Sequence, residues 1–245
     1  MVSRPDGRRA DELRPLTIER GFTMHAPGAI LVSFGNTKVI VTAMIEERVP
    51  RHIYQNDCDT HGWLTAEYSM LPGATNTRTQ RDRQKISGRT TEIQRLIGRC
   101  LRASIDLEKL GARTITIDAD VIQADGGTRV AAITGGFVAM ADAVAHLVKE
   151  GLLSAPPAMN PIAAVSVGIV NGEPVLDLNY AEDSTADVDA NIVMSKTGQI
   201  IEFQASTEKN AFDRATMTRM MDLAESGIQQ IVRAQEEALG LLASA

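Results

Sequence analysis

Residues 124–129, Ala124-Asp125-Gly126-Gly127-Thr128-Arg129, combine the chemical groups that bind an anion. They follow an apolar stretch at 115–121 that predicts a strand, and they precede residues 130–150, whose alanine content and apolar spacing predict a helix. A glycine pair lets backbone N–H groups approach a ligand closely, and the first turn of a helix leaves its N–H groups unpaired and partly positive. Thr128 adds a hydroxyl and Arg129 a guanidinium fork, so this turn is a candidate phosphate site. The alternative is an ordinary helix start, with Thr128 as its cap and Arg129 in solvent, because short glycine motifs often match by chance.

Two carboxylates, Asp183 and Asp189, lie at the end of one predicted hairpin and at the start of the next. If the fold brings them together, they can hold a hard divalent cation such as Mg²⁺, which prefers oxygen ligands. Such a cation would polarise a phosphoryl oxygen and neutralise developing charge. The alternative is a negatively charged loop between strands that binds no metal.

Positive charge is concentrated in residues 78–102. Eight basic residues stand there against two acids, so the segment carries +6, whereas the whole chain carries −6 and the remainder therefore −12. A basic segment on an acidic body indicates a localised site for a polyanion such as RNA. The eight residues are Arg78, Arg81, Arg83, Lys85, Arg89, Arg95, Arg99 and Arg102.

Residues 72–88 lack apolar periodicity and predict a mobile, arginine-rich loop, which is either a solvated linker or a flexible arm that grips RNA phosphates. Residues 90–107 predict a helix, because their apolar positions repeat at helical spacing. Arg95 and Arg99 lie on its opposite face, which is either ordinary wet surface or an RNA contact. Arg89 stands just before the first turn, where it can point at the same anion as the helix N-terminus.

The length of 245 residues and the 44% hydrophobic content suit one large globular domain or two small ones. No apolar run approaches the roughly 20 residues of a membrane span, and the charged beginning of the chain is unlike a signal peptide, so we expect no membrane partner. Cys58 and Cys100 are far apart and predict no disulfide framework, which suits the reducing cytoplasm. Neither these cysteines nor the four histidines form a zinc pattern.

The element order predicts the α+β class, with two related β/α halves in one domain, residues 1–245. Residues 1–14 hold four arginines among acids and predict an exposed or interface arm. Asn171-Gly172 is the strongest two-residue hairpin signal in the chain. The other predicted segments are strands at 30–34, 39–44, 63–71, 163–170, 174–178, 191–194 and 199–204, a loop at 48–62 and a closing helix at 212–239. The apolar face predicted for this helix holds Met217, Met220, Met221, Ala224, Ile228 and Ile231.

Several of these stretches, in the same order, resemble the ribonuclease PH family of phosphate-dependent 3′-to-5′ exoribonucleases. The likeness extends from about residue 14 to residue 239, nearly the whole chain. The stretches that carry it are residues 62–68 (GWLTAEY), 88–90 with 92–97 (GRT and EIQRLI), 123–129 (QADGGTR), 164–170 (AVSVGIV) and the segment that ends at 182–184 (EDS).

The resemblance implies a fold of the ribosomal protein S5 domain 2-like type, with two β/α halves about a pseudo-twofold axis. It implies that Arg89 and Gly127-Thr128-Arg129 bind the attacking phosphate, and that Asp183 and Asp189 are the catalytic and metal-binding pair for Mg²⁺ or Mn²⁺. The expected activity is that of a tRNA nucleotidyltransferase, which trims tRNA precursors, acts in rRNA processing and releases nucleoside diphosphates reversibly. The expected assembly is a homo-hexameric ring of three dimers that binds RNA but not DNA. The expected RNA contacts are Arg78, Arg81, Arg83, Lys85, Arg95 and Arg99.

The sequence departs from the family pattern in places that can alter RNA grip or assembly. Residues 52–61 are longer than usual, Ala190 stands where methionine is usual, the arginine-rich loop is slightly short, and residues 206–209 replace a more glycine-rich turn. Two alternatives keep the fold: a subunit of a larger exosome-like complex and an inactive RNA-binding scaffold. A third, a phosphate-binding kinase, lacks the P-loop pattern it would need.

Overall fold

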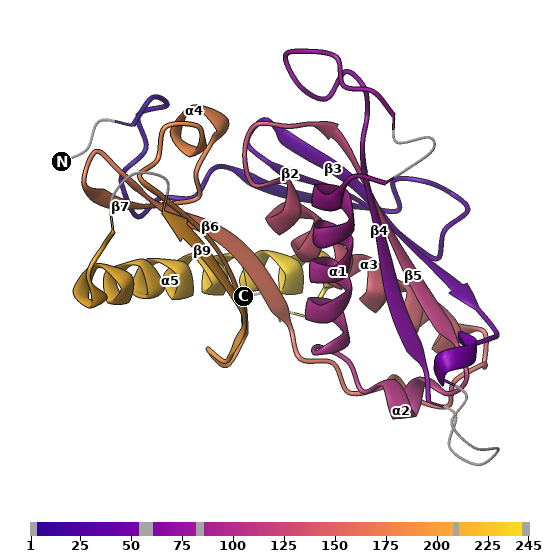
Figure 1. The fold of residues 1–245 in the computed structure, drawn as a ribbon. Helices are drawn as coiled ribbons and strands as arrows, with labels where there is room; N and C mark the ends of the chain where they lie inside the picture. Colours follow the sequence, from indigo (N-terminus) through magenta and orange to yellow (C-terminus); the bar gives the residue numbers. More distant parts are fainter. Residues whose placement is uncertain (1–3, 54–60, 82–85, 208–210, 242–245) are drawn as a thin grey trace.

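Two β-sheets, each packed against helices, form this α+β chain (Figure 1). The computed structural model describes residues 4–53, 61–81, 86–207 and 211–241. The first sheet has the strand order β1-β2-β3-β5-β4; all neighbours are antiparallel except β4 and β5, which are parallel. Its strands are β1 (Leu16–Arg20), β2 (Gly28–Phe34), β3 (Thr37–Glu46), β4 (Trp63–Met70) and β5 (Thr114–Gln123).

The second sheet is entirely antiparallel and has the order β7-β6-β8-β9. Its strands are β6 (Ile162–Val170), β7 (Glu173–Leu176), β8 (Val188–Ser195) and β9 (Ile200–Thr207). Every residue of β6 is buried, because this strand contacts both the long helix between the sheets and the closing helix. The prediction of an α+β fold with two β/α halves is therefore confirmed.

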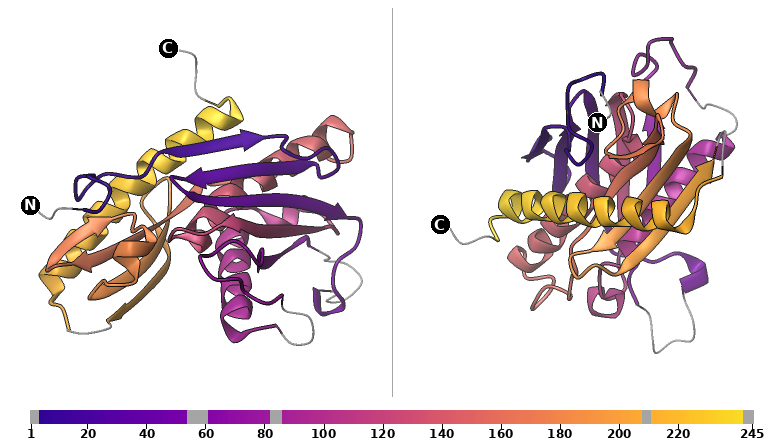
Figure 2. Two further views of the ribbon diagram at one scale, coloured as in Figure 1. Left: turned by 90° about the horizontal axis from the view of Figure 1, so that it is seen from above. Right: turned by 90° about the vertical axis from the view of Figure 1, so that its left-hand side faces the viewer.

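The helices divide between the two sheets. α1 (Gly88–Arg102) packs on β4, and α3 (Thr128–Lys149) packs on β2, β3 and β6, so that α3 is shared by both halves. α5 (Arg214–Leu239) runs along the second sheet, as both views of Figure 2 show. Three short pieces complete the chain: a 3-10 helix (Arg51–Ile53), α2 (Leu107–Leu110) and α4 (Tyr180–Asp183).

α3 is the apolar centre of the molecule, and one continuous cluster of buried side chains surrounds it. A Cβ atom at Gly135 would lie 2.8 Å from the Val32 side chain, so glycine there lets the helix approach β2 closely. By length and composition α3 is able to cross a membrane, contrary to the expectation that no segment reaches that length, but 83% of its apolar window is buried inside the fold. Its apolar character is explained by its position between the two sheets.

The predicted hairpins are confirmed, and their strands are longer than predicted except for β7, which ends at Leu176 rather than at Leu178. Asn171 (φ 51°) and Gly172 (φ 80°) both adopt the left-handed conformation that a tight two-residue hairpin turn requires. Hydrogen bonds to neighbouring strands extend the pairing beyond the apolar core of most runs, which explains why the apolar pattern alone underestimated most strand lengths.

Four sequence-based predictions are wrong. The helix predicted at 90–107 begins at Gly88 and ends at Arg102, because the chain turns there to form a β-bridge from Ile105 to Met159. The strand β1 was missed, because its apolar residues are few and it lies at a sheet edge. Met217, placed on the apolar face of the closing helix, is exposed. The arginine-rich segment at the N-terminus was predicted to be an exposed or interface arm, and the exposed alternative is wrong, since Arg4 and Arg14 are buried against carboxylates of the second half.

Candidate active site

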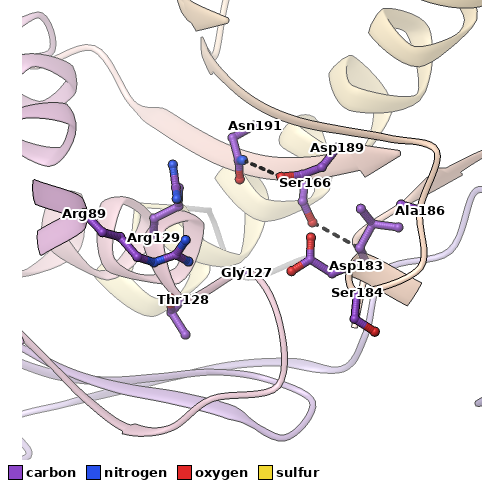
Figure 3. Close-up of a pocket in the computed structure, with 11 residues that line it drawn as sticks. Arg89, Gly127, Thr128, Arg129, Ser166, Asp183, Ser184, Ala186, Asp189 and Asn191 are labelled. Carbon is purple, nitrogen blue, oxygen red and sulfur yellow. Dashed lines mark hydrogen bonds between the residues drawn. The ribbon is translucent and has the colours of Figure 1, made fainter. Parts of the chain in front are cut away.

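A cleft with a volume of about 370 Å³ lies where the start of α3 meets α1, α4 and the second sheet. Its two ends differ in charge: the guanidinium groups of Arg89 and Arg129 lie at one end and the carboxylates of Asp183 and Asp189 at the other (Figure 3). The residues that line it are Arg89, Gly127, Thr128, Arg129, Ser166, Leu178, Asp183, Ser184, Ala186, Asp189 and Asn191. All six residues predicted for phosphate and metal binding are thus brought together in one cleft.

The turn between β5 and α3 shows why its two glycines are needed. Gly126 (φ 75°) and Gly127 (φ 68°) both have left-handed backbones. A Cβ atom at Gly126 would lie 2.6 Å from the carbonyl oxygen of Leu178, so the turn packs directly on the second half. The N-cap of α3 is Gly127 rather than Thr128, and no side chain caps this helix end. The N-terminus of α3 is therefore left without a side-chain partner for its N–H groups, at the edge of the cleft.

Thr128 is instead the first residue of α3, and its hydroxyl lies 2.8 Å from the hydroxyl of Tyr68 on β4. Burial raises the pKa of the Tyr68 phenol, although the Thr128 hydrogen bond and the nearby guanidinium groups act in the opposite direction. Tyr68 is consequently a protonated partner that fixes the Thr128 side chain at the edge of the cleft.

The two arginines are held differently. Arg129, in the first turn of α3, has a side chain only 17% exposed and lies 3.5 Å from Glu92 of α1 and 3.3 Å from the Gln204 amide oxygen of β9. The Gln204 amide also donates to Glu92 at 3.2 Å, so these two side chains together hold the Arg129 guanidinium in position. Arg89 is exposed in the first turn of α1, one residue inside the helix rather than before it. Burial raises the pKa values of both aspartates in the cleft, and the positive charges of Arg89 and Arg129 offset part of that rise.

The charge of Asp183 acts on Asp189. Asp183 is the last residue of α4 and Asp189 the second residue of β8. Burial raises the pKa of Asp183, and burial together with the charge of Asp183 raises the pKa of Asp189 to about 6. The arginines only partly offset these effects. The Asn191 amide, 3.5 Å away on the same face of β8, is the hydrogen-bond donor that the structure provides to Asp189.

This carboxylate pair fits a divalent cation. The pKa values of both carboxylates are raised, so the pair lacks a full counter-charge in the cleft, and a cation between them would supply it. Within the described ranges, no group of three or more His, Cys, Asp or Glu residues is placed to hold a metal. The pair therefore suits an ion such as Mg²⁺, which uses one or two carboxylates and completes its shell with water and substrate phosphates.

Four predicted RNA-contact residues that the structure describes lie outside the cleft lining: Arg78, Arg81, Arg95 and Arg99. All four are exposed, and Arg99 forms an ion pair with Glu202 of β9 at 3.1 Å. Two further predicted contacts, Arg83 and Lys85, fall outside the described residues. The described part of the predicted loop contains neither helix nor strand until Gly88, where α1 begins, and its base is fixed where Ala124 donates to the Ala74 carbonyl at 2.8 Å.

Sequence reasoning missed several residues that shape the cleft. Asn191 is two residues from Asp189, and this spacing puts both on one face of a strand, a signal that was available. Ser166 lies in the apolar strand β6, where its hydroxyl accepts the Leu178 N–H at 3.0 Å. Tyr68 and Gln204 carried no local signal, because their importance comes from partners 60 and 75 residues away.

Chemically, the cleft can hold an anion at its arginine end and a cation at its carboxylate end. Backbone N–H groups, a hydroxyl and two guanidinium groups suit the tetrahedral oxygens of phosphate. A divalent ion next to them can offset negative charge that develops on a reacting phosphoryl group. The arrangement fits displacement at phosphorus between two anionic reactants.

Comparison with known proteins agrees with this chemistry. Residues 12–145 match the first domain of the 3′ exoribonuclease family, and residues 160–227 match the second. A protein named ribonuclease PH from Synechococcus sp. (strain JA-3-3Ab) is 55% identical over 241 residues, which is 97% of this chain and 98% of that protein. Another, from Corynebacterium kroppenstedtii, is 53% identical over 238 residues, which is 96% of this chain and 92% of that protein.

Solved structures share the fold at much lower identity. Rice (Oryza sativa) Rrp46 superposes with a TM-score of 0.77 at 18% identity, covering 96% of this chain and 100% of that one. The Archaeoglobus fulgidus exosome with RNA bound to the active site also gives 0.77, at 21% identity, covering 94% and 92%.

Proposed function

This chain belongs to the ribonuclease PH family of 3′ exoribonucleases, and we propose from that premise that its cleft holds inorganic phosphate against the 3′ end of an RNA. The chain is a phosphorolytic 3′-to-5′ exoribonuclease, a nucleotidyltransferase that trims tRNA precursors. Phosphate is its co-substrate. What remains to be assigned is the part that each residue of the cleft plays.

The observation that carries the proposal is the opposition of charges in one cleft, with Arg89 and Arg129 at one end and Asp183 and Asp189 at the other. A hydrolase needs only water as its nucleophile. A phosphorolytic enzyme must bring a free phosphate anion next to a polyanionic RNA, and two guanidinium groups at a helix N-terminus offset that repulsion. The arginine end is therefore the phosphate site of the proposal, and Thr128 adds a hydroxyl that can donate to a phosphate oxygen.

In the reaction, a phosphate oxygen attacks the phosphorus of the last phosphodiester bond. A new P–O bond forms, the bond from phosphorus to the 3′-oxygen of the preceding nucleotide breaks, and that oxygen takes a proton. The products are a nucleoside diphosphate and an RNA shortened by one nucleotide. Because one phosphate linkage replaces another, the reverse addition from nucleoside diphosphates is also expected.

The carboxylates Asp183 and Asp189 would hold the Mg²⁺ or Mn²⁺ ion that the family uses. When bound, such an ion supplies positive charge that stabilises the transferring phosphoryl group. The chain's own contribution is to bring the exposed Asp183 and the half-buried Asp189 together in one cleft, where burial and the charge of Asp183 raise the pKa of Asp189 to about 6. A bound cation would offset that repulsion.

RNA would reach the cleft along the basic segment. Arg78, Arg81 and Arg95 are exposed, which supports a role in gripping phosphates, and Arg83 and Lys85 extend the charge in sequence. Exposed arginines that make phosphate contacts add affinity without reading sequence. RNA rather than DNA, and tRNA precursors together with rRNA, are the partners of this proposal.

The proposed assembly is a homo-hexamer built from three dimers, because a ring would gather several basic segments around one opening through which RNA enters. The cytoplasm is the proposed location. The buried, free thiol of Cys100, whose pKa burial raises to about 12, supports a compartment where cysteines stay reduced.

A product assay tests the function directly. The protein is incubated with Mg²⁺ and an RNA bearing a 3′ tail, with and without inorganic phosphate, and the released nucleotides are separated by chromatography. We expect nucleoside diphosphates only when phosphate is present. Nucleoside monophosphates in equal amounts without phosphate would mean hydrolysis and would refute the proposal. RNA binding with no release in either condition would instead identify an inactive scaffold.

A further inference from the structure

The first described residues, 4–14, form an N-terminal arm in which Arg4 and Arg14 are buried. In Figure 1 this indigo segment lies beside α4, in the other half of the molecule. The side chains of Arg4 and its partner Glu182 are 0% and 1% exposed, and those of Arg14 and its partner Asp177 are 4% and 0% exposed. Burying such pairs gives little net stability, because desolvation offsets much of their attraction. The main effect of these ion pairs is to fix the positions of the segments that they join.

Arg14 connects the phosphate-binding turn to the second half. Its backbone N–H and its Nε both donate to Asp177 Oδ2, at 2.8 and 3.0 Å, and its Nη2 donates to Oδ1 at 2.7 Å. Its Nη1 donates to the Asp125 carbonyl at 2.5 Å, and Nη2 lies 3.5 Å from the Gly126 carbonyl. One guanidinium group thus holds both Asp177 and the turn that leads into α3 at the edge of the cleft.

Other bonds converge on the same turn. The Thr37 hydroxyl donates to the Gly126 carbonyl at 2.6 Å, and it accepts the Asp125 N–H at 3.0 Å. Asp125 Oδ1 accepts the N–H of Tyr180, the first residue of α4, at 3.2 Å. The turn is therefore fixed to β3, to the N-terminal arm and to α4 together.

Arg4 acts on the other end of the cleft. Its Nε and Nη2 bind the two oxygens of Glu182 at 2.6 and 2.8 Å, as a bidentate pair. Glu182 also closes a capping box with Asn179 at the start of α4, and the residue that follows it is Asp183. The position of Asp183 is thus set by a helix of four residues that the arm holds in place.

Arg8 lies between these two pairs. Its Nη1 donates to the Asp177 carbonyl at 3.0 Å, and its Nη2 lies 3.5 Å from Glu182 Oε2. In the same arm, the Arg9 side chain is exposed and forms an ion pair with Asp11, which is also exposed. The buried arginines can therefore be compared with a neighbour that has no contact with the cleft.

We infer that the N-terminal arm is a positioning element of the active site, in which Arg14 sets the phosphate-binding turn and Arg4 sets Asp183. The inference rests on the proposed function, because that function makes the turn the phosphate-binding site and makes the carboxylates necessary for the rate of the reaction. Displacements of about 1 Å at reacting groups cost on the order of 100-fold in rate. Loss of a side chain that positions these groups should therefore change kcat or KM. The two arginines should differ in the kinetic constant that they control.

The test uses Arg14→Lys and Arg4→Lys, which keep a charge next to Asp177 and Glu182 but lose the guanidinium fork. We expect Arg14→Lys to raise KM for phosphate ~10-fold with kcat within ~2-fold, and Arg4→Lys to lower kcat ~10-fold with KM for phosphate nearly unchanged. Arg9→Lys is the matched control and should change neither constant. Amide hydrogen exchange should increase at residues 125–127 in the first variant and at 179–183 in the second.

If Arg14→Lys does not fold, the double variant Arg14→Met with Asp177→Asn replaces it. It leaves no buried charge unpaired, and asparagine tolerates the left-handed backbone of Asp177 (φ 55°). Its phosphate KM should rise in the same way. Equal losses of activity and melting temperature in the Arg14 and Arg4 variants, with both KM values unchanged, would mean that the arm only stabilises the fold and would overturn the inference.

Phosphate affinity measured by calorimetry separates this inference from the proposed function. If the wild-type protein releases no nucleoside diphosphate, the proposed function fails, yet phosphate binding still reports on the turn. Weaker binding in Arg14→Lys but not in Arg4→Lys or Arg9→Lys supports the positioning role. Equal affinity in all four proteins contradicts it.

Discussion

The hydroxyl groups of Tyr68 and Thr128 lie 2.8 Å apart, although they come from a strand and a helix separated by 60 residues. Either oxygen can donate in this pair. An anion in the cleft favours the arrangement in which Tyr68 donates, because the proton of Thr128 is then free to point at a phosphate oxygen. Burial raises the pKa of Tyr68, so its phenol stays protonated and able to donate.

Tyr68→Phe should therefore raise KM for phosphate ~2- to 10-fold, the range that one hydrogen bond of about 0.5–1.5 kcal/mol predicts, with a smaller effect on kcat. Tyr180→Phe is the control, because Tyr180 has an exposed side chain and no side-chain hydrogen bond among the described residues. An unchanged phosphate KM in Tyr68→Phe would show that the tyrosine does not orient Thr128.

Arg129→Ala should mainly weaken the use of phosphate, since it removes a guanidinium contact from the anion end of the cleft. We expect KM for phosphate to rise ~10- to 100-fold, and high phosphate to recover part of the rate. Initial rates measured across a wide range of phosphate concentration check this, with the exposed Arg233→Ala on α5 as the control. A loss of rate that no phosphate concentration relieves would place Arg129 elsewhere in the reaction.

Asp189→Asn, unlike Arg129→Ala, should lower kcat rather than raise KM for phosphate. It preserves shape but removes a charge from the carboxylate pair, so kcat should fall at least ~100-fold at every phosphate concentration. RNA affinity, measured separately by filter binding, should be retained, because the exposed arginines are untouched. Asp222→Asn on the exposed face of α5 is the control. Normal turnover in Asp189→Asn, or full rescue by phosphate, would exclude Asp189 from the metal site.

The same substitution should stabilise the protein when no divalent metal is present. The folded-state pKa of Asp189 is about 6 against 3.8 for the free group, so the folded state binds more protons between these values. Stability should therefore fall as the pH rises from about 4 to 6, and the full penalty, on the order of 1–3 kcal/mol, should be present above pH 6.

Urea unfolding in EDTA at pH 7.5 should accordingly show Asp189→Asn to be more stable than the wild-type protein. At pH 3.5 both side chains are neutral, and the difference should vanish. Mg²⁺ added at pH 7.5 should stabilise the wild-type protein more than the variant. Equal stability of the two proteins at pH 7.5 would mean that the carboxylate is not strained.

Sedimentation should find a hexamer at micromolar concentration. A monomer that retains full activity would contradict the proposed ring.

Removal of the exposed positive charges at Arg78 and Arg81 should weaken RNA binding and reduce its dependence on salt, without changing KM for phosphate.

Local sequence determined much of this molecule. The strand, glycine pair and helix around residues 115–150, the Asn171-Gly172 hairpin and the closing helix were all predictable, because turn chemistry and apolar spacing act between near neighbours. The six residues predicted to bind phosphate and metal do meet in one cleft. The resemblance to a family supplied that grouping, since the spacing between Arg89 and Asp189 carries no information on distance in space.

Only the tertiary structure decided how these residues are supported. The N-terminal arginines looked solvated because charged side chains usually are, yet Arg14 is buried against Asp177, 163 residues away. The raised pKa of Asp189 depends on burial and on the charge of Asp183, which sequence spacing does not specify. Desolvation and charge–charge interaction both depend on what surrounds a group in three dimensions, so they are determined only when the two halves pack together.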